Sequence, residues 1–349
     1  MTHEFKSLIE GYLSAKEIGL QAVLATVVDL DGSSYRRPGV RMMITENGHM
    51  TGAVSGGCVE KEILKQASSV FITGNAKMMT YDGRYRLGCE GVLYILIEKL
   101  SPTPEMINDF KKCIQDRKPF QIESIYSNKI GVNSEIGSVI SFSNNKKYSF
   151  CESKELTKER NTNYKTFTQV MSPCFRLIIV GAEHDAAQLC LSANNLGWEV
   201  QIVTSPSDPQ TKEDFPGVHT IHPVNPEDFN ISQIDNNSAI VLMTHNYAKD
   251  LRFLLTLKEA QPAYLGLLGP LKRREKLLND FMDLNPLIDD SFFDMVYGPV
   301  GLNIGAETPQ EISLSICSEI LAVIRKEEPK PLKDKTGTIH HHVSFLKNE

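Results

Sequence analysis

The stretch RLIIVGAEHDAAQLCLSANNLG, residues 176–197, sets the architecture of the second half of this 349-residue chain. The run 176–180 is apolar after its first residue, which predicts a buried strand, and Gly181 directly after it predicts a tight turn. The helical spacing of apolar residues over 185–196 then predicts a helix. A strand, a glycine turn and a helix in this order begin a βαβ unit, in which consecutive strands run parallel.

The same alternation continues toward the C-terminus. Strand-like and helical runs follow in turn at 199–204, 238–243, 247–259 and 264–268. A last helix begins at Thr308, which can cap it, with Pro309 at the first helical position and Glu311 completing a capping box. Alternating strands and helices predict an α/β fold, here a Rossmann-like domain with a doubly wound parallel sheet.

The first half of the chain predicts a mixed α+β domain. Apolar residues at helical spacing over 5–13 indicate a first helix that ends near Gly19, and those over 59–67 indicate a second. Short apolar runs indicate strands at 22–28, 40–44, 50–54 and 92–97. The pair Asn47-Gly48 between two of these runs is a hairpin signal. The mixture of hairpin strands and helices separates this half from the parallel sheet that follows.

A polar middle region predicts the boundary between the two halves. From about Ser101 the composition turns polar, and the runs 143–147 and 158–163 are typical of turns or linkers. We therefore expect an N-terminal domain over 1–165, a Rossmann-like domain over 166–330 and a tail over 331–349. Two domains also fit the length, which exceeds the size at which single cores stop growing.

Composition and charge exclude several classes of protein. The net charge of −6 and pI of about 5.9 give no electrostatic footprint for nucleic acid. There is no secretion signal and no long apolar run, so we expect a cytoplasmic protein without a membrane partner. The seven cysteines are odd in number and include no Cys-x-x-Cys pair, which argues against a disulfide framework and a structural zinc site.

The segment Ser55-Gly56-Gly57-Cys58 lies between a predicted strand and a predicted helix. Its glycines permit close approach of a ligand, and the helix N-terminus that follows favours an anion and the thiolate form of Cys58. The segment is therefore a candidate cofactor-binding loop, with Cys58 as a candidate metal ligand. A tight turn with a small buried cysteine explains the same pattern equally well.

A second candidate anion site precedes it in the loop 32–41. Guanidinium groups offer forked donors to an anion and hydroxyl groups add shorter ones. The candidate binding residues of this loop are Ser33, Ser34, Arg36, Arg37 and Arg41. A solvated charged turn is the alternative interpretation. Cys89, which lies between glycines before the strand 92–97, is a third candidate, although burial alone explains a cysteine there equally well.

The second half departs from the dinucleotide fingerprint. Gly181, the first glycine of that fingerprint, is present and is a candidate cofactor-binding residue. Glu183, however, occupies the position of the glycine that lets backbone approach a pyrophosphate, and a carboxylate repels phosphate. The strand 199–204 also lacks the acidic residue expected to bind a ribose hydroxyl. NAD(P) binding is therefore disfavoured. His245 follows the strand 238–243 at the edge where α/β sheets place ligands, and is a candidate ligand or acid–base group, or a helix-capping residue.

Long motifs in both halves resemble the XdhC/CoxI family. In the first half these are GSSYRRPG at 32–39, GAVSGGCVE at 52–60 and LGCEG at 87–91. In the second half they are LMTHNY at 242–247, YLGLLGP at 264–270 and GPVGLNIGAETP at 298–309. The motifs cover both domains in the family's order and leave only the middle region and the C-terminal end without a match.

The resemblance implies an accessory protein of xanthine dehydrogenase rather than a catalyst. Such a protein binds the molybdenum cofactor (molybdopterin), assists its sulfuration and delivers it to the apo-enzyme, a molybdenum hydroxylase. The implied partners are that apo-enzyme and a cysteine desulfurase-type sulfur donor. The arginine loop would supply donors for the pterin phosphate, and Cys58 a soft ligand for the metal or for sulfur transfer. We expect a homodimer, the commonest assembly of soluble proteins.

Two other functions remain open at this point. An NAD(P)-dependent oxidoreductase would use the Rossmann-like half to bind its dinucleotide, although Glu183 disfavours that binding. A pure interaction scaffold would need neither the arginine loop nor Cys58. Titration with NAD and with molybdenum cofactor separates the three.

Overall fold

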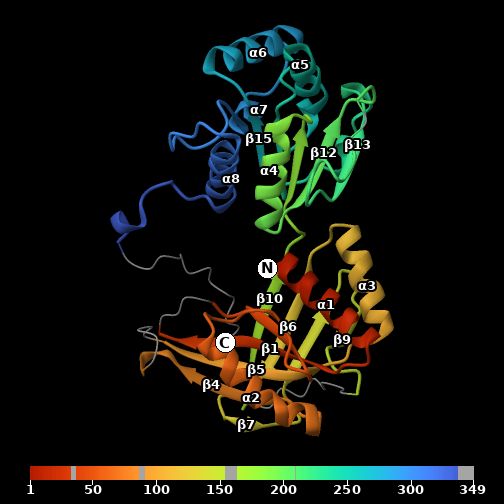
Figure 1. Cartoon of the computed structure of the whole chain (residues 1–349), viewed down its shortest axis with the longest axis vertical. Helices are drawn as coiled ribbons and strands as arrows, with labels where there is room; N and C mark the ends of the chain where they lie inside the picture. Colours follow the sequence, from red (N-terminus) through yellow and green to blue (C-terminus); the bar gives the residue numbers. More distant parts are fainter. Residues whose placement is uncertain (33–36, 86–90, 154–162, 209, 337–349) are drawn as a thin grey trace. The chain divides into compact units, whose positions relative to one another are not determined.

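The described chain divides into two compact units that meet in the sequence between Pro173 and Cys174 (Figure 1). A computed structural model describes residues 1–32, 37–85, 91–153, 163–208 and 210–336. Among these residues, no helix combines the length and the apolar character that crossing a membrane requires. The hydrophobic clusters of the first unit lie within residues 5–171 and those of the second within 175–324. Each unit therefore has its own core.

An antiparallel six-stranded sheet with the order β3-β2-β1-β5-β4-β7 forms the base of the first unit. Its strands are β1 (Ala22–Asp31), β2 (Arg41–Thr45), β3 (Met50–Gly52), β4 (Lys77–Asp82), β5 (Val92–Leu100) and β7 (Gly131–Val132), with the 3-10 turn η1 (Gly83–Tyr85) after β4. Helix α2 (Cys58–Thr73) packs on one face. The predicted hairpin is confirmed, since β2 and β3 pair antiparallel.

Both faces of this sheet are buried, which explains the nearly unbroken apolar run of β1. Val23, Ala25 and Val27 point into the core shared with α2, whereas Ala22 and Leu24 point into a second core. That second core is formed with α1 (Thr2–Glu17) and α3 (Pro104–Gln115) and contains Phe5, which contacts the rings of three other phenylalanines.

A second sheet stands where the sequence predicted a linker. Its order is β10-β6-β8-β9, with β6 (Phe120–Tyr126), β8 (Gly137–Ser141), β9 (Lys147–Ser149) and β10 (Lys165–Met171). The residues of β6 alternate strictly between buried and half-buried, and two of the three half-buried residues, Gln121 and Glu123, are polar. Average polarity hides such a strand, which is why composition alone indicates a linker from about residue 101.

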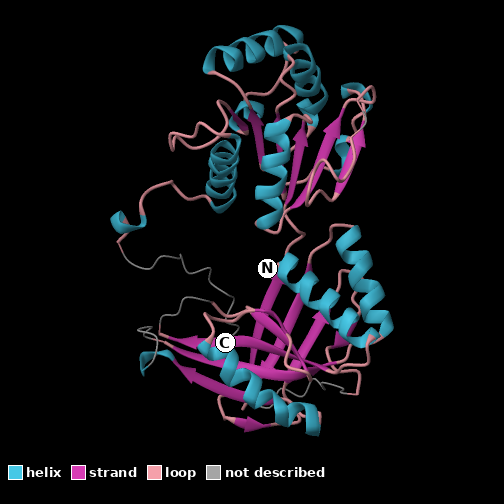
Figure 2. Cartoon of the chain, in the orientation of Figure 1, coloured by secondary structure: helices cyan, strands magenta, loops and turns pink. Residues whose placement is uncertain are grey.

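The second unit has the predicted Rossmann-like architecture. Its strands β11 (Arg176–Val180), β12 (Glu199–Thr204), β13 (Thr220–Pro223), β14 (Ser238–Leu242), β15 (Tyr264–Leu267) and β16 (Val296–Tyr297) all run parallel. Figure 2 shows this sheet with helices on both sides. The helices are α4 (His184–Asn195), α5 (Tyr247–Thr256), α6 (Leu271–Leu284), α7 (Ser291–Asp294) and α8 (Pro309–Arg325). The short 3-10 turns are η2 (Pro226–Asp228), η3 (Ile231–Gln233), η4 (Leu257–Glu259) and η5 (Leu332–Asp334).

The strand order β13-β12-β11-β14-β15-β16 defines a switch point between β11 and β14. After β11 the chain continues to β12 on one side, and it later returns to β14 on the other side. Ligands of open α/β sheets bind in the crevice beyond the carboxyl ends of two such strands. The turns 181–183 and 243–246 lie at this crevice.

Candidate functional site

The loop between β3 and α2 presents Cys58 at the start of a helix, as the sequence predicted. Gly57 precedes the helix with a φ of +121°, a conformation that favours glycine. Cys58 is the first residue of α2 and is exposed. Ser55 is half-buried and Gly56 exposed, so the segment 55–58 borders solvent. The alternative of a buried structural cysteine does not apply to Cys58.

Glu60 holds this loop from within, and sequence reasoning missed it. Its buried carboxylate accepts hydrogen bonds from the backbone N–H groups of Val54 (3.1 Å), Ser55 (2.6 Å) and Gly57 (2.7 Å). These three donors are therefore not available to an anion, contrary to the simplest interpretation of a glycine loop. The carboxylate instead fixes the backbone that carries the Cys58 thiol. A Glu three residues after Gly57 was half of a capping-box signal.

Exposure distinguishes Cys58 from the other described cysteines. Cys113, Cys151, Cys174, Cys190 and Cys317 are buried, and none forms a disulfide. Burial raises the pKa of Cys190 to about 11 and that of Cys317 to about 12, so both stay protonated near neutral pH. Cys89 lies outside the described residues. Among the described thiols, Cys58 is accordingly the candidate nucleophile or soft ligand.

The arginine loop is only partly described. Ser33, Ser34 and Arg36 lie outside the described residues, and Arg37 is half-buried at the loop's end. Arg41 was expected to donate to an anion, but it lies in β2 and is 7% exposed. The structure therefore places the last arginine of the predicted site inside the first unit.

Arg41 anchors the loop instead of facing solvent. Its Nη1 donates to the carbonyl of Gly39 at 2.9 Å and to Oε1 of Gln169 in β10 at 2.5 Å. Burial lowers the pKa of Arg41 to about 10, partly offset by Glu98, so the side chain remains charged at neutral pH. The partner Gln169 lies 128 residues away in sequence, beyond the reach of local sequence reasoning.

At the switch point of the second unit, the turn after β11 packs closely against the end of β14 and is followed by two acidic residues. Gly181 has a φ of +138°, and a Cβ there would lie 2.3 Å from the carbonyl oxygen of Met243. A side chain at position 181 would clash with the backbone that follows β14, so this position requires glycine. Glu183 precedes α4 and is exposed, and Asp185 lies in the first turn. Two carboxylates occupy the place where a dinucleotide fold holds its pyrophosphate.

His245 lies beside that acidic turn. Its Nε2 is 3.6 Å from Oδ2 of Asp185, and its side chain is 48% exposed. Its φ of +54° is a left-handed conformation that non-glycine residues seldom adopt. The structure thus brings Gly181 and His245 to one crevice, as their positions after β11 and β14 predicted.

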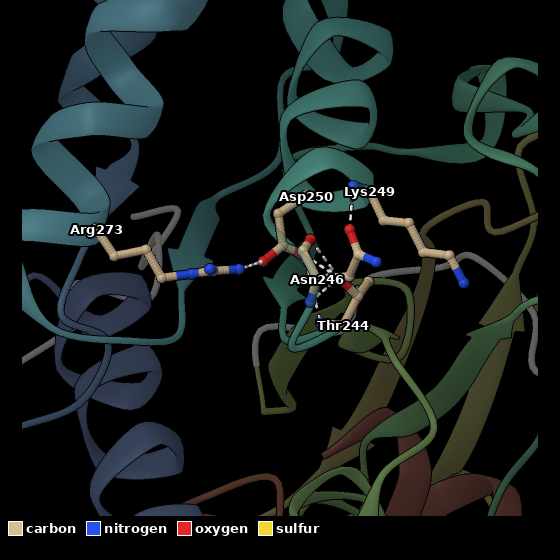
Figure 3. Close-up of polar contacts among 5 residues, drawn as sticks. All are labelled: Thr244, Asn246, Lys249, Asp250 and Arg273. Atoms are coloured by element: carbon tan, nitrogen blue, oxygen red, sulfur yellow. Dashed lines mark hydrogen bonds and ion pairs between the residues drawn. The ribbon is translucent and has the colours of Figure 1, made fainter.

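A buried carboxylate fixes the turn that carries His245 (Figure 3). Asp250 in α5 accepts hydrogen bonds from the backbone N–H (3.3 Å) and Oγ1 (2.6 Å) of Thr244. It also pairs with Nη2 of Arg273 in α6 at 2.6 Å. Asn246 caps α5 by accepting from the N–H of Lys249 at 3.1 Å. Sequence reasoning missed Asp250 and Arg273, whose pairing depends on the packing of α5 against α6.

The described residues contain no cluster of three or more His, Cys, Asp or Glu side chains suited to a metal ion. Within these residues, Cys58 is therefore not part of such a cluster.

Comparisons with known proteins agree in both units. A sequence model of the XdhC Rossmann domain matches residues 177–320, and a model of the XdhC and CoxI family matches residues 16–82. A Bacillus subtilis (strain 168) protein named as a probable subunit of xanthine dehydrogenase is 29% identical over 334 residues, covering 91% of this chain and 96% of the relative.

Two further proteins are similar over nearly the whole chain. The molybdenum cofactor insertion chaperone PaoD of Escherichia coli (strain K12) is 23% identical over 333 residues, covering 94% of this chain and 91% of PaoD. A crystal structure from Bacillus halodurans, described as a xanthine dehydrogenase, superposes with a TM-score of 0.75 at 26% identity, covering 92% of this chain and 97% of that one.

Proposed function

Because the chain belongs to the XdhC and CoxI family, we propose that it is an accessory protein that carries the molybdenum cofactor for a xanthine dehydrogenase-type enzyme. The likeness to a molybdenum cofactor insertion chaperone over 94% of the chain supports this role. The structural observation that carries the proposal is the exposed Cys58 thiol, held on a loop whose backbone is fixed by Glu60.

The thiol suits a metal centre that is handed over rather than kept. A thiolate is a soft ligand for molybdenum and also a carrier of sulfur, so Cys58 serves both binding and sulfuration in this proposal. In this proposal the metal arrives with the cofactor's own ligands, so it can leave again when the apo-enzyme binds. Arg37 lies at the end of the neighbouring loop and would add charge for the cofactor's phosphate. The roles of Ser33, Ser34, Arg36 and Cys89 stay predictions.

The direct test is retention of the cofactor. Purified protein is mixed with isolated molybdenum cofactor, passed through gel filtration and analysed for molybdenum. We expect a defined stoichiometry for the wild type and a marked loss for Cys58→Ser. Cys151→Ser is the matched control, because Cys151 already lies beside the hydroxyls of Ser101 and Ser153 and a serine fits there. Equal retention by wild type and Cys58→Ser would exclude Cys58 from the site.

The alternative of an NAD(P)-dependent oxidoreductase rests on the Rossmann strand order. Glu183 and Asp185 at the start of α4 disfavour a pyrophosphate there, because two carboxylates repel it. NAD titration of the same preparation separates the two functions. Tight, saturable NAD binding together with no molybdenum retention would favour the oxidoreductase and overturn the accessory role.

A further inference from the structure

The first turn of α6 carries more positive charge than the start of a helix normally tolerates. Lys272, Arg273 and Arg274 are consecutive, Lys276 follows, and the first turn has no acidic residue. The N-terminal end of a helix has partial positive charge, so these cations are repelled by the helix and by one another. Natural sequences break such local rules mainly where function requires it.

The cations stand at the ligand-binding edge of the sheet, since α6 starts directly after β15. A Cβ at Gly269 would lie 2.7 Å from Cδ of Arg273, whose stem crosses that turn to reach Asp250 beyond β14. A Cβ at Gly298, after β16, would lie 3.1 Å from Cδ of Arg274. The two arginines therefore extend to either side of the β15 carboxyl end, each along a glycine.

Most of this charge is not compensated by the protein. Asp250 pairs with Arg273, and Lys276 lies over the ring of Tyr247, 4.8 Å from its centroid. Within the described ranges, no carboxylate oxygen comes within 4.0 Å of the charged groups of Lys272, Arg274 or Lys276. Nε of Arg274 is also buried without a hydrogen-bond partner among these residues.

Tyr247 does not neutralise the positive charge of this turn. Its hydroxyl donates to Asp280 at 2.6 Å, and burial together with Asp280 raises its pKa to about 12, so it stays neutral. Glu275 is exposed on the same helix and forms no ion pair with these cations within the described part of the chain. The edge beside β15 is therefore positive, whereas the edge beside β11 carries Glu183 and Asp185.

We propose that the first turn of α6 binds the phosphate or pyrophosphate group of a small-molecule ligand. Forked guanidinium donors, lysine charge and the helix N-terminus all favour a phosphate there, and the carboxyl edge of the sheet provides access. The phosphate subsite has thus moved from the β11 turn, where a dinucleotide fold places it, to the β15 turn. The inference uses residues of the second unit alone and does not depend on the proposed function.

Inorganic pyrophosphate is the probe, titrated calorimetrically into the full-length protein at low and at high salt. We expect saturable binding that weakens with salt. Lys272→Glu and Arg274→Met should each weaken it by about tenfold or more, because each removes a charge-assisted contact. Methionine keeps the apolar stem beside Gly298. Lys258→Ala, an exposed lysine in η4 beyond the far end of α5, is the matched control and should bind as the wild type does.

Thermal unfolding separates an effect on binding from an effect on stability. An acid in the first turn of a helix is favourable, so Lys272→Glu should melt no lower than the wild type in the absence of ligand while losing affinity. Unchanged pyrophosphate binding in Lys272→Glu and Arg274→Met would overturn the site, and so would the absence of saturable binding to the wild type. A lower melting temperature for Lys272→Glu would show instead that Lys272 has a structural role.

The source of the phosphate is resolved by competition. Displacement of pyrophosphate by molybdenum cofactor identifies the cofactor's own phosphate as the ligand, and simultaneous binding of both identifies a separate nucleotide or phosphate ester. Failure of this inference is distinguishable from failure of the proposed function. If the protein retains molybdenum but binds no pyrophosphate, only the proposed α6 site is contradicted. If it binds pyrophosphate but retains no molybdenum, only the accessory role is contradicted.

Discussion

At the scale of single residues, exposure decides which thiols of this protein can react. Burial holds the pKa of Cys190 at about 11, so near pH 8 only about one thiol in a thousand is ionised there. Cys58 is exposed at the N-terminus of α2. In a Cys89→Ser background, we expect Cys58 to be alkylated much faster than the buried cysteines, as measured by mass spectrometry of the labelled peptides.

Bound molybdenum cofactor should slow this labelling, because it would occupy the same thiol. Pyrophosphate, whose proposed site lies in the other unit, should not protect Cys58 and is the control. Labelling that is slow with and without cofactor would mean that Cys58 is inert and that the cofactor is held elsewhere.

A second prediction concerns Gly39, which connects the arginine loop to β2. Its φ is +98°, and a Cβ there would lie 2.5 Å from Nε2 of Gln169. Gly48 has a similar φ of +86° but open space around it. By urea unfolding, Gly48→Ala should cost about 1 kcal/mol through backbone strain alone. Gly39→Ala should cost ~1–3 kcal/mol more, because the Gln169–Arg41 pair must move. An equal loss of unfolding free energy in both variants would show that Gln169 can move aside without cost.

The candidate site shows where sequence reasoning ends. The place of Cys58 at a helix start follows from local pattern, since glycines before helical spacing indicate a turn and a helix. The burial of Arg41 does not, because its partner Gln169 is supplied by a strand 128 residues away. Asp250 and Arg273 likewise meet only through the packing of two helices. Long-range pairing, rather than residue type, decides which charged residues face solvent.

At the scale of elements, the prediction succeeded where periodicity was strong. β11 and β12 begin and end at the predicted residues, because the central strands of a parallel sheet are buried on both faces and are therefore mostly apolar. The second sheet of the first unit was missed because its strands mix polar with apolar residues and lie between polar turns. Testing period two within the polar region, instead of averaging over it, would have indicated the start of β6, where apolar and polar residues alternate over 120–123.

The capping box of α8 gives a prediction with a defined pH dependence. Glu311 accepts hydrogen bonds from the N–H groups of Glu307 and Thr308, and these backbone donors lower its pKa. A lowered folded-state pKa stabilises the fold above the unfolded value of about 4.3 and loses that contribution as the pH falls through the folded value. Glu311→Gln should therefore melt below the wild type at neutral pH, with the difference vanishing at acid pH.

The measurement is the melting temperature of both proteins across that range. Since α8 packs against α4, a weaker cap should also loosen the helix that starts at the switch point. A constant offset between the two proteins down to low pH would show that the charge of Glu311 contributes nothing. Thr308→Ala, which removes the other half of the box, should cost about 1 kcal/mol at every pH.

At the scale of the whole molecule, the distribution of the cores predicts that the two units fold independently. Every hydrophobic cluster of the described chain belongs to residues before Pro173 or after Cys174. Each unit also exceeds the size at which domains commonly fold alone. We expect the fragments 1–173 and 174–349, expressed separately, each to unfold in one cooperative transition, as followed by circular dichroism and urea titration.

Independent folding then allows the two proposed sites to be assigned to their units. The fragment 1–173 contains Cys58 and Arg37 and should be alkylated at Cys58 as the full chain is, because the loop is held by Glu60 within the same fragment. The fragment 174–349 contains the first turn of α6 and should bind pyrophosphate with the affinity of the full chain, since all its proposed contacts are local to that unit. A folded second fragment that binds no pyrophosphate, beside a full chain that does, would show that the first unit supplies part of the phosphate site.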